Sequence, residues 1–310
     1  MPEIMRVENL RKEFGKTVAL KDISFCIEKG EVFGYLGPNG SGKTTTIRIF
    51  LGILRPTSGQ AILFDEDISK DSAKVRERIG FVLEDQRLYE RLSAYDNLEY
   101  FARIYQVPKG RREEKIKRLL EFVGLWGNKD QLVGKFSKGM KQRLAIARSL
   151  VHDPEVLFYD EPTIGLDPEI QVIVRDLIVE LVKEGKKTIF LNSHNLDEVQ
   201  KICSKVAILK KGEILMCDSL KKLRSENKKP EVEVTLDNMP EDIIKEIKSL
   251  DFVTDCEPKD NKIIFRLKET AGTNDILEYL LQKNLKVREV KEVTKTLEDV
   301  YLEVMKEQEE

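Results

Sequence analysis

Long hydrophobic runs are missing from this chain of 310 residues. No stretch approaches the roughly 18 uninterrupted apolar residues that a bilayer-spanning helix needs. Residues 1–6 also lack the apolar region of a signal peptide. The sequence therefore predicts a cytoplasmic protein that has no membrane span of its own.

Cysteine is scarce, and the net charge is close to zero. Lys and Arg together number 53 against 55 Asp and Glu, a formal net charge of −2. This balance gives no electrostatic reason to expect a nucleic-acid partner. Because the four cysteines show no C-x-x-C spacing, neither disulfides nor a structural zinc site is expected. The cysteines are Cys26, Cys203, Cys217 and Cys256.

A glycine-rich segment at 37–44 is the most informative motif that is present. It stands between an apolar run at 32–36 and a helical pattern that begins near Thr45. Glycines let backbone N–H groups point at phosphate oxygens, and the following helix adds the positive end of its dipole. Lys43 can reach the β- and γ-phosphates, and the Thr44 hydroxyl suits Mg²⁺. The segment predicts a nucleoside triphosphate site formed by Gly37, Pro38, Asn39, Gly40, Ser41, Gly42, Lys43, Thr44 and Thr45.

The chain divides into an α/β region and a smaller C-terminal region. The α/β pattern of residues 1–220 is interrupted at about 85–150 by helical spacing, which begins where Ser93 and Asp96 resemble a capping box. A polar run at 221–230 is typical of a linker. Residues 231–310 alternate as βαββαβ. We expect a P-loop α/β core with a helical subdomain, followed by a small α+β domain of the ferredoxin-like type.

Two adjacent carboxylates follow the wholly apolar strand at 156–159. Asp160 is placed to hold Mg²⁺ through water, and Glu161 is placed to polarise an attacking water. Two such acids are costly to bury unless a cation lies nearby. Together with the phosphate loop, the pair predicts nucleotide hydrolysis.

At this point the chain resembles the ATP-binding subunit of an ABC transporter. The resemblance covers residues 3–220 and rests on five motifs that occur in the order typical of that family. They are the Walker A loop at 37–44, the signature-like segment Phe136-Ser137-Lys138-Gly139-Met140-Lys141-Gln142-Arg143, the Walker B pair Asp160-Glu161, the D-loop Gly165-Leu166-Asp167, and the switch histidine His194.

The resemblance implies a role for each motif. Ser137 and Gly139 would face the γ-phosphate bound by the opposite subunit, and Asp167 would lie at the dimer interface. Phe14 would stack on adenine, and His194 would contact the γ-phosphate. The catalytic residues would be Lys43, Glu161 and His194, with Thr44, Glu84 and Asp160 around the metal.

The chain departs from the family pattern in two places. Lys138 and Met140 replace the usual Gly and Gln of the signature, and SKGM forms resemble those of drug- and ion-export ATPases. In the segment 79–86, either Glu84 or Gln86 occupies the position of the family's Q-loop glutamine. We favour Glu84, because the apolar run before it leads directly into it as a strand would.

The resemblance also implies cofactors and partners. ATP and Mg²⁺ would be bound by a head-to-tail homodimer, and hydrolysis would drive transport through a separate polytopic permease. Export is the favoured direction. The chain would then lie at the inner face of the membrane through that permease, docked near Glu84 and residues 94–106. The alternative is a soluble ABC-type ATPase that acts on ribosomes or nucleic acid. Such proteins usually carry two cassettes, a long coiled coil or zinc sites, and this sequence has none of these.

Overall fold

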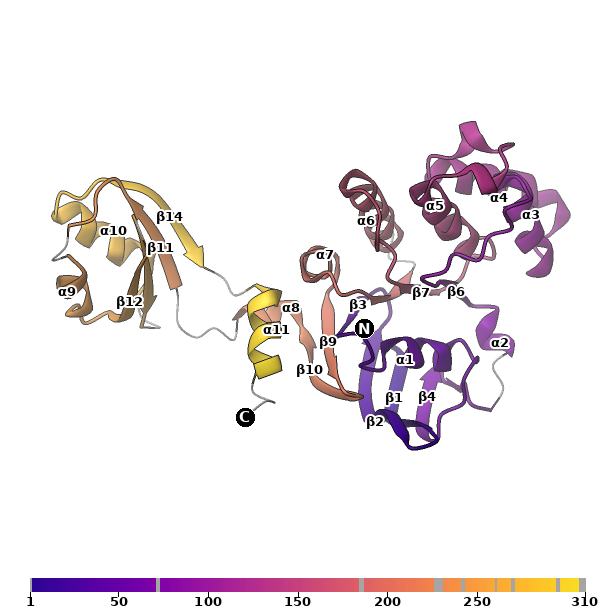
Figure 1. The fold of residues 1–310 in the computed structure, drawn as a ribbon, viewed down its shortest axis with the longest axis horizontal. Helices are drawn as coiled ribbons and strands as arrows, with labels where there is room; N and C mark the ends of the chain where they lie inside the picture. Colours follow the sequence, from indigo (N-terminus) through magenta and orange to yellow (C-terminus); the bar gives the residue numbers. More distant parts are fainter. Residues whose placement is uncertain are drawn as a thin grey trace. The chain divides into compact units, whose positions relative to one another are not determined.

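The computed structural model describes residues 2–70, 73–183, 187–225, 231–240, 243–259, 261–268, 271–293 and 296–306. These residues belong to two compact units (Figure 1). One unit comprises Met1–Leu220 together with Glu303–Glu310, and the other comprises Lys221–Leu302. Each unit is described by itself below.

The first unit is built on a six-stranded sheet with the strand order β10-β9-β3-β8-β7-β6. All neighbouring strands are parallel except β9 and β10, which form an antiparallel hairpin. Every residue of β3, β7 and β8 is buried, because a parallel sheet covered on both faces favours continuous apolar strands. The strands are β3 (Val32–Leu36), β6 (Ile79–Val82), β7 (Val156–Asp160), β8 (Thr188–Asn192), β9 (Lys205–Lys210) and β10 (Glu213–Ser219).

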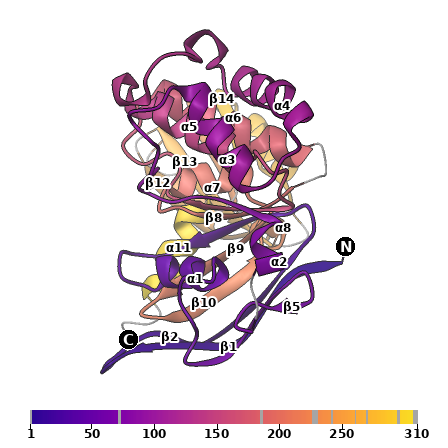
Figure 2. The same cartoon turned by 90° about the vertical axis from the view of Figure 1, so that its right-hand side faces the viewer.

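A second, antiparallel sheet with the order β2-β1-β4-β5 lies beside α1 (Lys43–Phe50) (Figure 2). Side chains from both sheets and from α1 form one apolar core, in which Phe50 stacks on Phe158 with a ring-centroid distance of 5.5 Å. This shared core fixes the loop between β3 and α1. The strands are β1 (Glu3–Phe14), β2 (Thr17–Glu28), β4 (Ser58–Leu63) and β5 (Glu66–Asp67).

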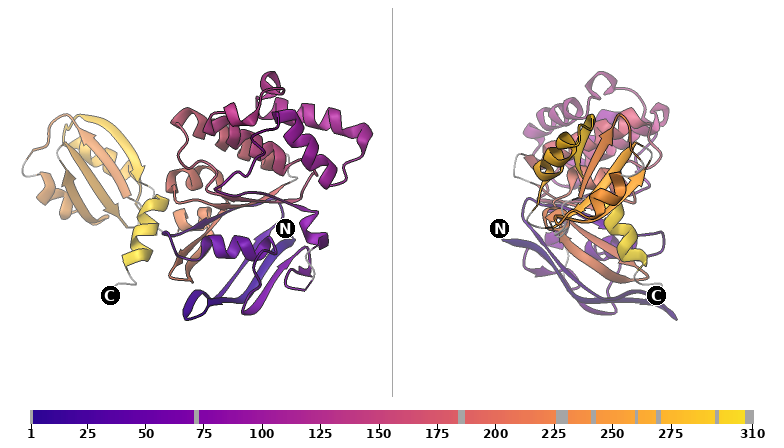
Figure 3. Two further views of the ribbon diagram at one scale, coloured as in Figure 1. Left: turned by 45° about the vertical axis from the view of Figure 1, so that its right-hand side comes forward. Right: turned by 90° about the vertical axis from the view of Figure 1, so that its left-hand side faces the viewer.

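The predicted helical insertion consists of α3 (Ala94–Ile104), α4 (Lys109–Phe122) and α5 (Lys138–Ser149), with short 3₁₀ turns at Trp126–Asn128 and Val133–Lys135. Figures 2 and 3 show these helices grouped together at the far side of the large sheet from the antiparallel sheet. Ser93 is the N-cap of α3, and its hydroxyl accepts a hydrogen bond of 3.0 Å from the N–H of Asp96. The capping signal read from the sequence is therefore confirmed.

The remaining helices of this unit are α2 (Ala73–Arg76), α6 (Pro168–Lys183) and α7 (Leu196–Ile202). The helix after the phosphate loop begins two residues before Thr45, and Gly42 in a left-handed conformation is its N-cap. Within the predicted linker at 221–230, residues 221–225 belong to α8 (Leu220–Ser225), in which Leu220 and Leu223 are buried one helical turn apart. The division between the two units falls within this helix, after Leu220. Residues 226–230 lie outside the described residues.

The second unit has the strand order β12-β13-β11-β14, with all pairs antiparallel. This βαββαβ arrangement confirms the predicted ferredoxin-like type. Along β11 and β13, buried residues alternate with half-buried ones, and the buried face packs against α9 and α10. The elements of this unit are β11 (Glu231–Leu236), α9 (Ile243–Lys248), β12 (Val253–Lys259), β13 (Lys262–Leu267), α10 (Thr273–Gln282) and β14 (Val287–Val293). The last helix, α11 (Leu297–Lys306), begins in this unit, and its residues from Glu303 onward belong to the first unit. Among the described helices of both units, none is long and apolar enough to cross a membrane.

Candidate nucleotide-binding site

The loop between β3 and α1 takes a shape that requires glycine at defined positions. Gly37 and Gly42 have φ angles of 155° and 112°, which side-chain-bearing residues rarely adopt. A Cβ atom on Gly42 would lie 2.6 Å from the carbonyl oxygen of Ala19, and one on Gly37 would lie 2.7 Å from Oγ of Ser41. The backbone thus passes close to β2 at Gly42 and close to the Ser41 hydroxyl at Gly37.

Lys43 crosses the loop from the first turn of α1. Its Nζ donates hydrogen bonds to the carbonyl oxygens of Gly37 at 2.7 Å and Pro38 at 3.1 Å. Burial lowers the pKa of the Lys43 ammonium, against the raising influence of Glu161 and Asp160. The buried Ser41 hydroxyl has no hydrogen-bond partner among the described residues. An ammonium and an orphaned hydroxyl inside one loop fit a phosphate group.

A cavity of about 680 Å³ opens beside this loop. It brings together residues from five separate segments of the sequence, which meet because parallel strands end at the same edge of the sheet. Of the predicted site residues, the cavity is lined by Gly37, Pro38, Asn39, Gly40, Gly42, Lys43, Thr44, Thr45, Glu84, Asp160, Glu161 and His194.

Asp160 is the buried acid at the end of β7. Burial raises the pKa of its carboxyl group, and the charges of Glu161 and Glu84 act in the same direction. The hydrogen bond from Nδ2 of Asn192 and the charge of Lys43 oppose this rise. Oδ1 of Asn192 has no partner among the described residues. Buried oxygens of this kind, beside the Thr44 hydroxyl, fit a hydrated divalent cation.

Glu161 and His194 both line the cavity and lie in contact with each other. Nδ1 of His194 lies 2.8 Å from Oε2 of Glu161. Glu161 has a left-handed φ of 52°, and its N–H donates to the carbonyl of Asn192 at 2.9 Å. The turn therefore aims the carboxylate away from the buried side of Asp160 and towards the histidine in the loop after β8.

Glu84 and Gln86 lie in different surroundings. Glu84 lines the nucleotide cavity, whereas Nε2 of Gln86 donates to Oε1 of Gln142 on α5 at 2.8 Å. The main-chain carbonyl of Gln86 accepts a hydrogen bond of 2.6 Å from Nη1 of Arg148. Burial lowers the pKa of the Arg148 guanidinium to about 10, so the group remains charged at neutral pH.

Five predicted residues do not line this cavity: Ser41, which is buried within the loop itself, and Phe14, Ser137, Gly139 and Asp167. Ser137 is the N-cap of α5, and its hydroxyl accepts from the N–H of Met140 at 3.2 Å. Gly139 lies against α6, where an added Cβ atom would come within 2.7 Å of Cγ2 of Ile170. Phe14 is 47% exposed at the end of β1. Phe14, Ser137 and Asp167 are exposed and Gly139 is buried, and all four lie outside the lining of the cavity beside the chain's own phosphate loop.

Sequence reasoning missed several residues around the site. Ala19, Ile164 and Asn192 also line the cavity. The sequence could have indicated Asn192, because it is the polar residue that ends the apolar strand at 188–191. Nothing in the sequence indicates Glu198, whose buried carboxylate accepts a hydrogen bond of 2.7 Å from the hydroxyl of Thr163, 35 positions away in the sequence.

Comparison with known families gives two matches along the chain. The profile of the ABC transporter family matches residues 20–164. The profile of the C-terminal domain of DrrA1-3-like ATP-binding proteins matches residues 219–305.

Two relatives illustrate the similarity of sequence. The uncharacterized ABC transporter ATP-binding protein YhcH of Bacillus subtilis is 36% identical over 312 residues, which cover 100% of this chain and 98% of YhcH. The bacitracin transport ATP-binding protein BcrA of Bacillus licheniformis is 41% identical over 229 residues, or 74% of each chain.

Two solved structures share the fold. CbiO1 from Clostridium perfringens, part of the transporter complex cbiONQ, has a TM-score of 0.67 and 32% identity over 80% of this chain and 95% of its own. The dimeric ATP-binding cassette MJ0796, in a post-hydrolysis state with ADP and Pi, has a TM-score of 0.64 and 27% identity over 70% of this chain and 98% of its own.

Proposed function

The chain belongs to the ABC transporter family as an ATP-binding and ATP-hydrolysing subunit, and from this we propose how its own residues use ATP. Two copies close head to tail around two MgATP, and hydrolysis reopens them. The cycle drives a separate membrane permease. The observation that carries the proposal is the convergence of Lys43, Asp160, Glu161 and His194 on one cavity.

Nucleotide binding is assigned to the loop and to α1. The backbone N–H groups of residues 39–45 point at the phosphates, and Lys43 exchanges its two carbonyl partners for the β- and γ-phosphates. Thr44 and Asp160 would hold Mg²⁺, with Glu84 beside them. When bound, Mg²⁺ would supply positive charge that stabilises the phosphate oxygens. The exposed ring of Phe14 stacks on adenine.

Hydrolysis is assigned to Glu161 and His194. The Glu161 carboxylate accepts a proton from the water that attacks the γ-phosphate. His194, at 2.8 Å from that carboxylate, orients it and donates a hydrogen bond to the γ-phosphate as charge develops. The left-handed turn at Glu161 supports this role, because a strained backbone conformation fixes where the carboxylate points.

A second copy completes each site. Ser137 and Gly139 stand at the N-terminus of the twelve-residue helix α5, which presents N–H groups and a positive dipole end to an anion. They lie outside the chain's own cavity, so we assign them to the γ-phosphate of the opposite copy, with Asp167 at the interface. The dimeric state of the cassette MJ0796 supports this arrangement.

The permease is assigned to the surface around α3. A cavity of about 290 Å³ there is lined by Ile53, Tyr89 and Phe101, among others, and both Ile53 and Tyr89 are exposed. Docking there would place the chain at the inner face of a membrane. Export as the direction is supported by the match to the DrrA1-3-like C-terminal domain and by similarity to the transport protein BcrA.

The proposal is tested with Glu161→Gln. This variant removes the proton acceptor but keeps the size of the side chain, so it should bind MgATP, stop turnover and accumulate as a closed dimer in gel filtration. Lys43→Ala is the matched control, which should lose nucleotide binding and stay monomeric. A Glu161→Gln protein that binds ATP yet remains monomeric contradicts the head-to-tail model. Co-purification of the wild type with ribosomes, and never with a membrane protein, contradicts the transporter partner.

A further inference from the structure

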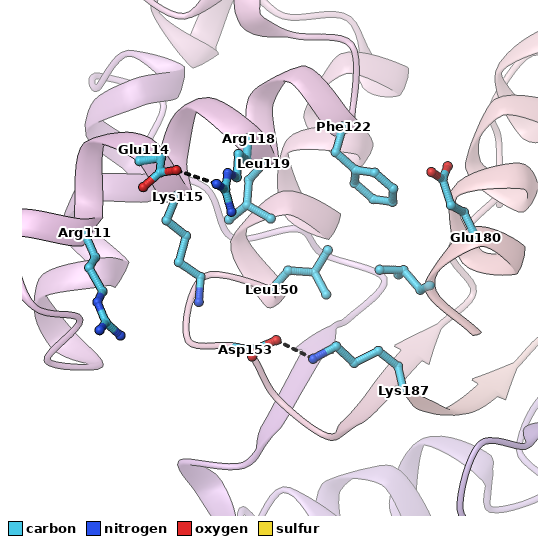
Figure 4. Close-up of a pocket in the computed structure, with 11 residues that line it drawn as sticks. Arg111, Glu114, Lys115, Arg118, Leu119, Phe122, Leu150, Asp153, Glu180 and Lys187 are labelled. Carbon is cyan, nitrogen blue, oxygen red and sulfur yellow. Dashed lines mark hydrogen bonds and ion pairs between the residues drawn. The ribbon is translucent and has the colours of Figure 1, made fainter. Parts of the chain in front are cut away.

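A cavity of about 730 Å³ lies between α4 and the end of α6 (Figure 4). It shares no lining residue with the nucleotide cavity. Its walls come from α4 of the helical insertion, from the chain that follows α5, and from α6 and Lys187 in the α/β core. A molecule bound here would therefore contact both the insertion and the core.

One part of this cavity is apolar. Leu119 and Phe122 from α4 face Leu150, which follows α5, and Figure 4 shows their side chains around the same space. Leu150 is buried, whereas Leu119 and Phe122 are half-buried. A volume in this range is typical of a small-molecule site, and this apolar part could hold the hydrocarbon portion of a ligand.

The other part of the cavity is lined by cationic side chains, some of which form ion pairs with an acid and some of which form none with a described residue. Arg118 is paired with Glu114, and Lys187 with Asp153. No described residue forms a hydrogen bond or an ion pair with the Lys115 ammonium, although Lys115 is only half-exposed and Figure 4 shows it extending towards the cavity. Arg111 lies at the same end, away from Phe122 and Glu180.

Lys115 is partly desolvated and has no described acid bonded to its ammonium group. Burial lowers the pKa of this ammonium, the charge of Asp153 opposes the lowering, and the charge of Lys187 adds to it. An unpaired ammonium in partly desolvated surroundings gains most from a carboxylate that forms a charge-assisted hydrogen bond. Glu180, which forms no ion pair with a described residue, lies at the far end of the cavity in Figure 4.

We propose that this cavity binds a small organic monoanion of medium chain length, with its carboxylate at Lys115 and its apolar body along Leu119, Phe122 and Leu150. The two ends of the cavity match the two ends of such a molecule. Bound ligand joins the helical insertion to the core, and it therefore stabilises their association in the folded chain.

The probe for this proposal is octanoate, titrated into the full-length protein by calorimetry below its micelle concentration. Octylamine and octanol serve as probes of the same length with a positive or no charge. We expect octanoate to bind more tightly than either. Shortening it to hexanoate should weaken binding about fourfold per methylene removed, as expected for burial of the chain.

Lys115→Gln tests the carboxylate contact and should weaken octanoate binding at least about tenfold. The matched control is Lys117→Gln on the same helix, which removes an exposed lysine that pairs with Glu121 at 3.9 Å and should leave the affinity unchanged. Phe122→Ala should reduce the dependence on chain length. Circular dichroism checks that each variant is folded.

Four outcomes would overturn the proposal. Three are equal octanoate affinity in Lys115→Gln and the wild type, tighter binding of octylamine than of octanoate, and no binding at millimolar octanoate. Saturating ADP should leave the octanoate affinity unchanged, because the two cavities are separate. Displacement of octanoate by ADP would place it in the nucleotide cavity instead, and would also overturn the proposal.

Discussion

Nη1 of Arg148 donates a hydrogen bond of 2.6 Å to the main-chain carbonyl of Gln86. A second bond of 3.2 Å from the same nitrogen reaches the carbonyl of Arg87, and the guanidinium stacks 5.2 Å from the ring centre of Phe101. The loop that carries Glu84 into the nucleotide cavity is thereby tied to α5 and to the aromatic side of α3.

We predict that Arg148→Met lowers the free energy of unfolding by about 2 kcal/mol, because it leaves partly buried carbonyl groups without a donor. Arg148→Lys should recover only part of this loss, since a lysine cannot reach two carbonyls with a planar fork. Urea denaturation of each variant measures the change. Arg103→Met, which breaks only an exposed pair with Glu99, is the control and should cost about 0.5 kcal/mol or less. Equal losses at the two positions would argue against the anchoring role.

We predict that replacing Glu84 and replacing Gln86 have different effects on ATP hydrolysis. Glu84 lines the cavity, and Gln86 is bonded to Gln142, so Glu84→Ala should reduce ATP hydrolysis more than Gln86→Ala. Glu84→Ala should also raise the Mg²⁺ concentration needed for half-maximal turnover. Steady-state ATPase assays across a magnesium series test both statements. A larger loss with Gln86→Ala would assign the metal-facing role to Gln86.

Asp160 predicts a pH dependence of stability in the nucleotide-free protein. Because burial raises its pKa in the folded state, the folded form binds the proton more tightly than the unfolded chain, and the ionised carboxylate destabilises the fold above the raised pKa. Asp160→Asn should therefore raise the melting temperature at pH 7.

The gain should shrink as the pH falls through the raised pKa and should vanish below the ordinary value of 3.8, where the wild-type carboxyl is protonated in both states. Thermal melts without nucleotide or magnesium measure it. The same variant should lose magnesium-dependent ATP hydrolysis. A stability gain that is independent of pH would show that the carboxylate charge is not the cause.

Ser41→Ala should separate folding from nucleotide binding. The Ser41 hydroxyl is buried without a partner, so its removal should leave the stability of the nucleotide-free protein unchanged or raise it by about 1 kcal/mol. Affinity for ATP should fall, because a donor to phosphate is lost. Calorimetric titration with MgATP and thermal melts give the two readouts. A marked drop in melting temperature without nucleotide would show that the hydroxyl has a structural partner.

Much of the fold was predictable because its signals are local. The phosphate loop lies between a buried strand and a helix, Ser93 caps α3, and residues 231–236 form a strand as their alternation predicts. The helix at Leu220–Ser225 was not predicted, because most of its residues are polar and only Leu220 and Leu223 are apolar and buried.

The parts that escaped prediction depend on contacts between distant segments. Arg148 and Gln86 are 62 positions apart, and nothing near either residue in the sequence indicates their hydrogen bond. Asn192 meets Asp160 only because β7 and β8 are neighbours in the sheet. A sequence shows which side chains have suitable chemistry, but not which of them the fold brings together.

Helix α5 carries Ser137 at its first turn and Arg148 at its last. Its twelve residues span about 18 Å as one stiff rod. A pull on its N-terminus by the nucleotide of another copy would displace its C-terminus as well, and with it the loop that holds Glu84. Closure of one ATP site would then move residues of the other site, so that the two sites would be mechanically coupled.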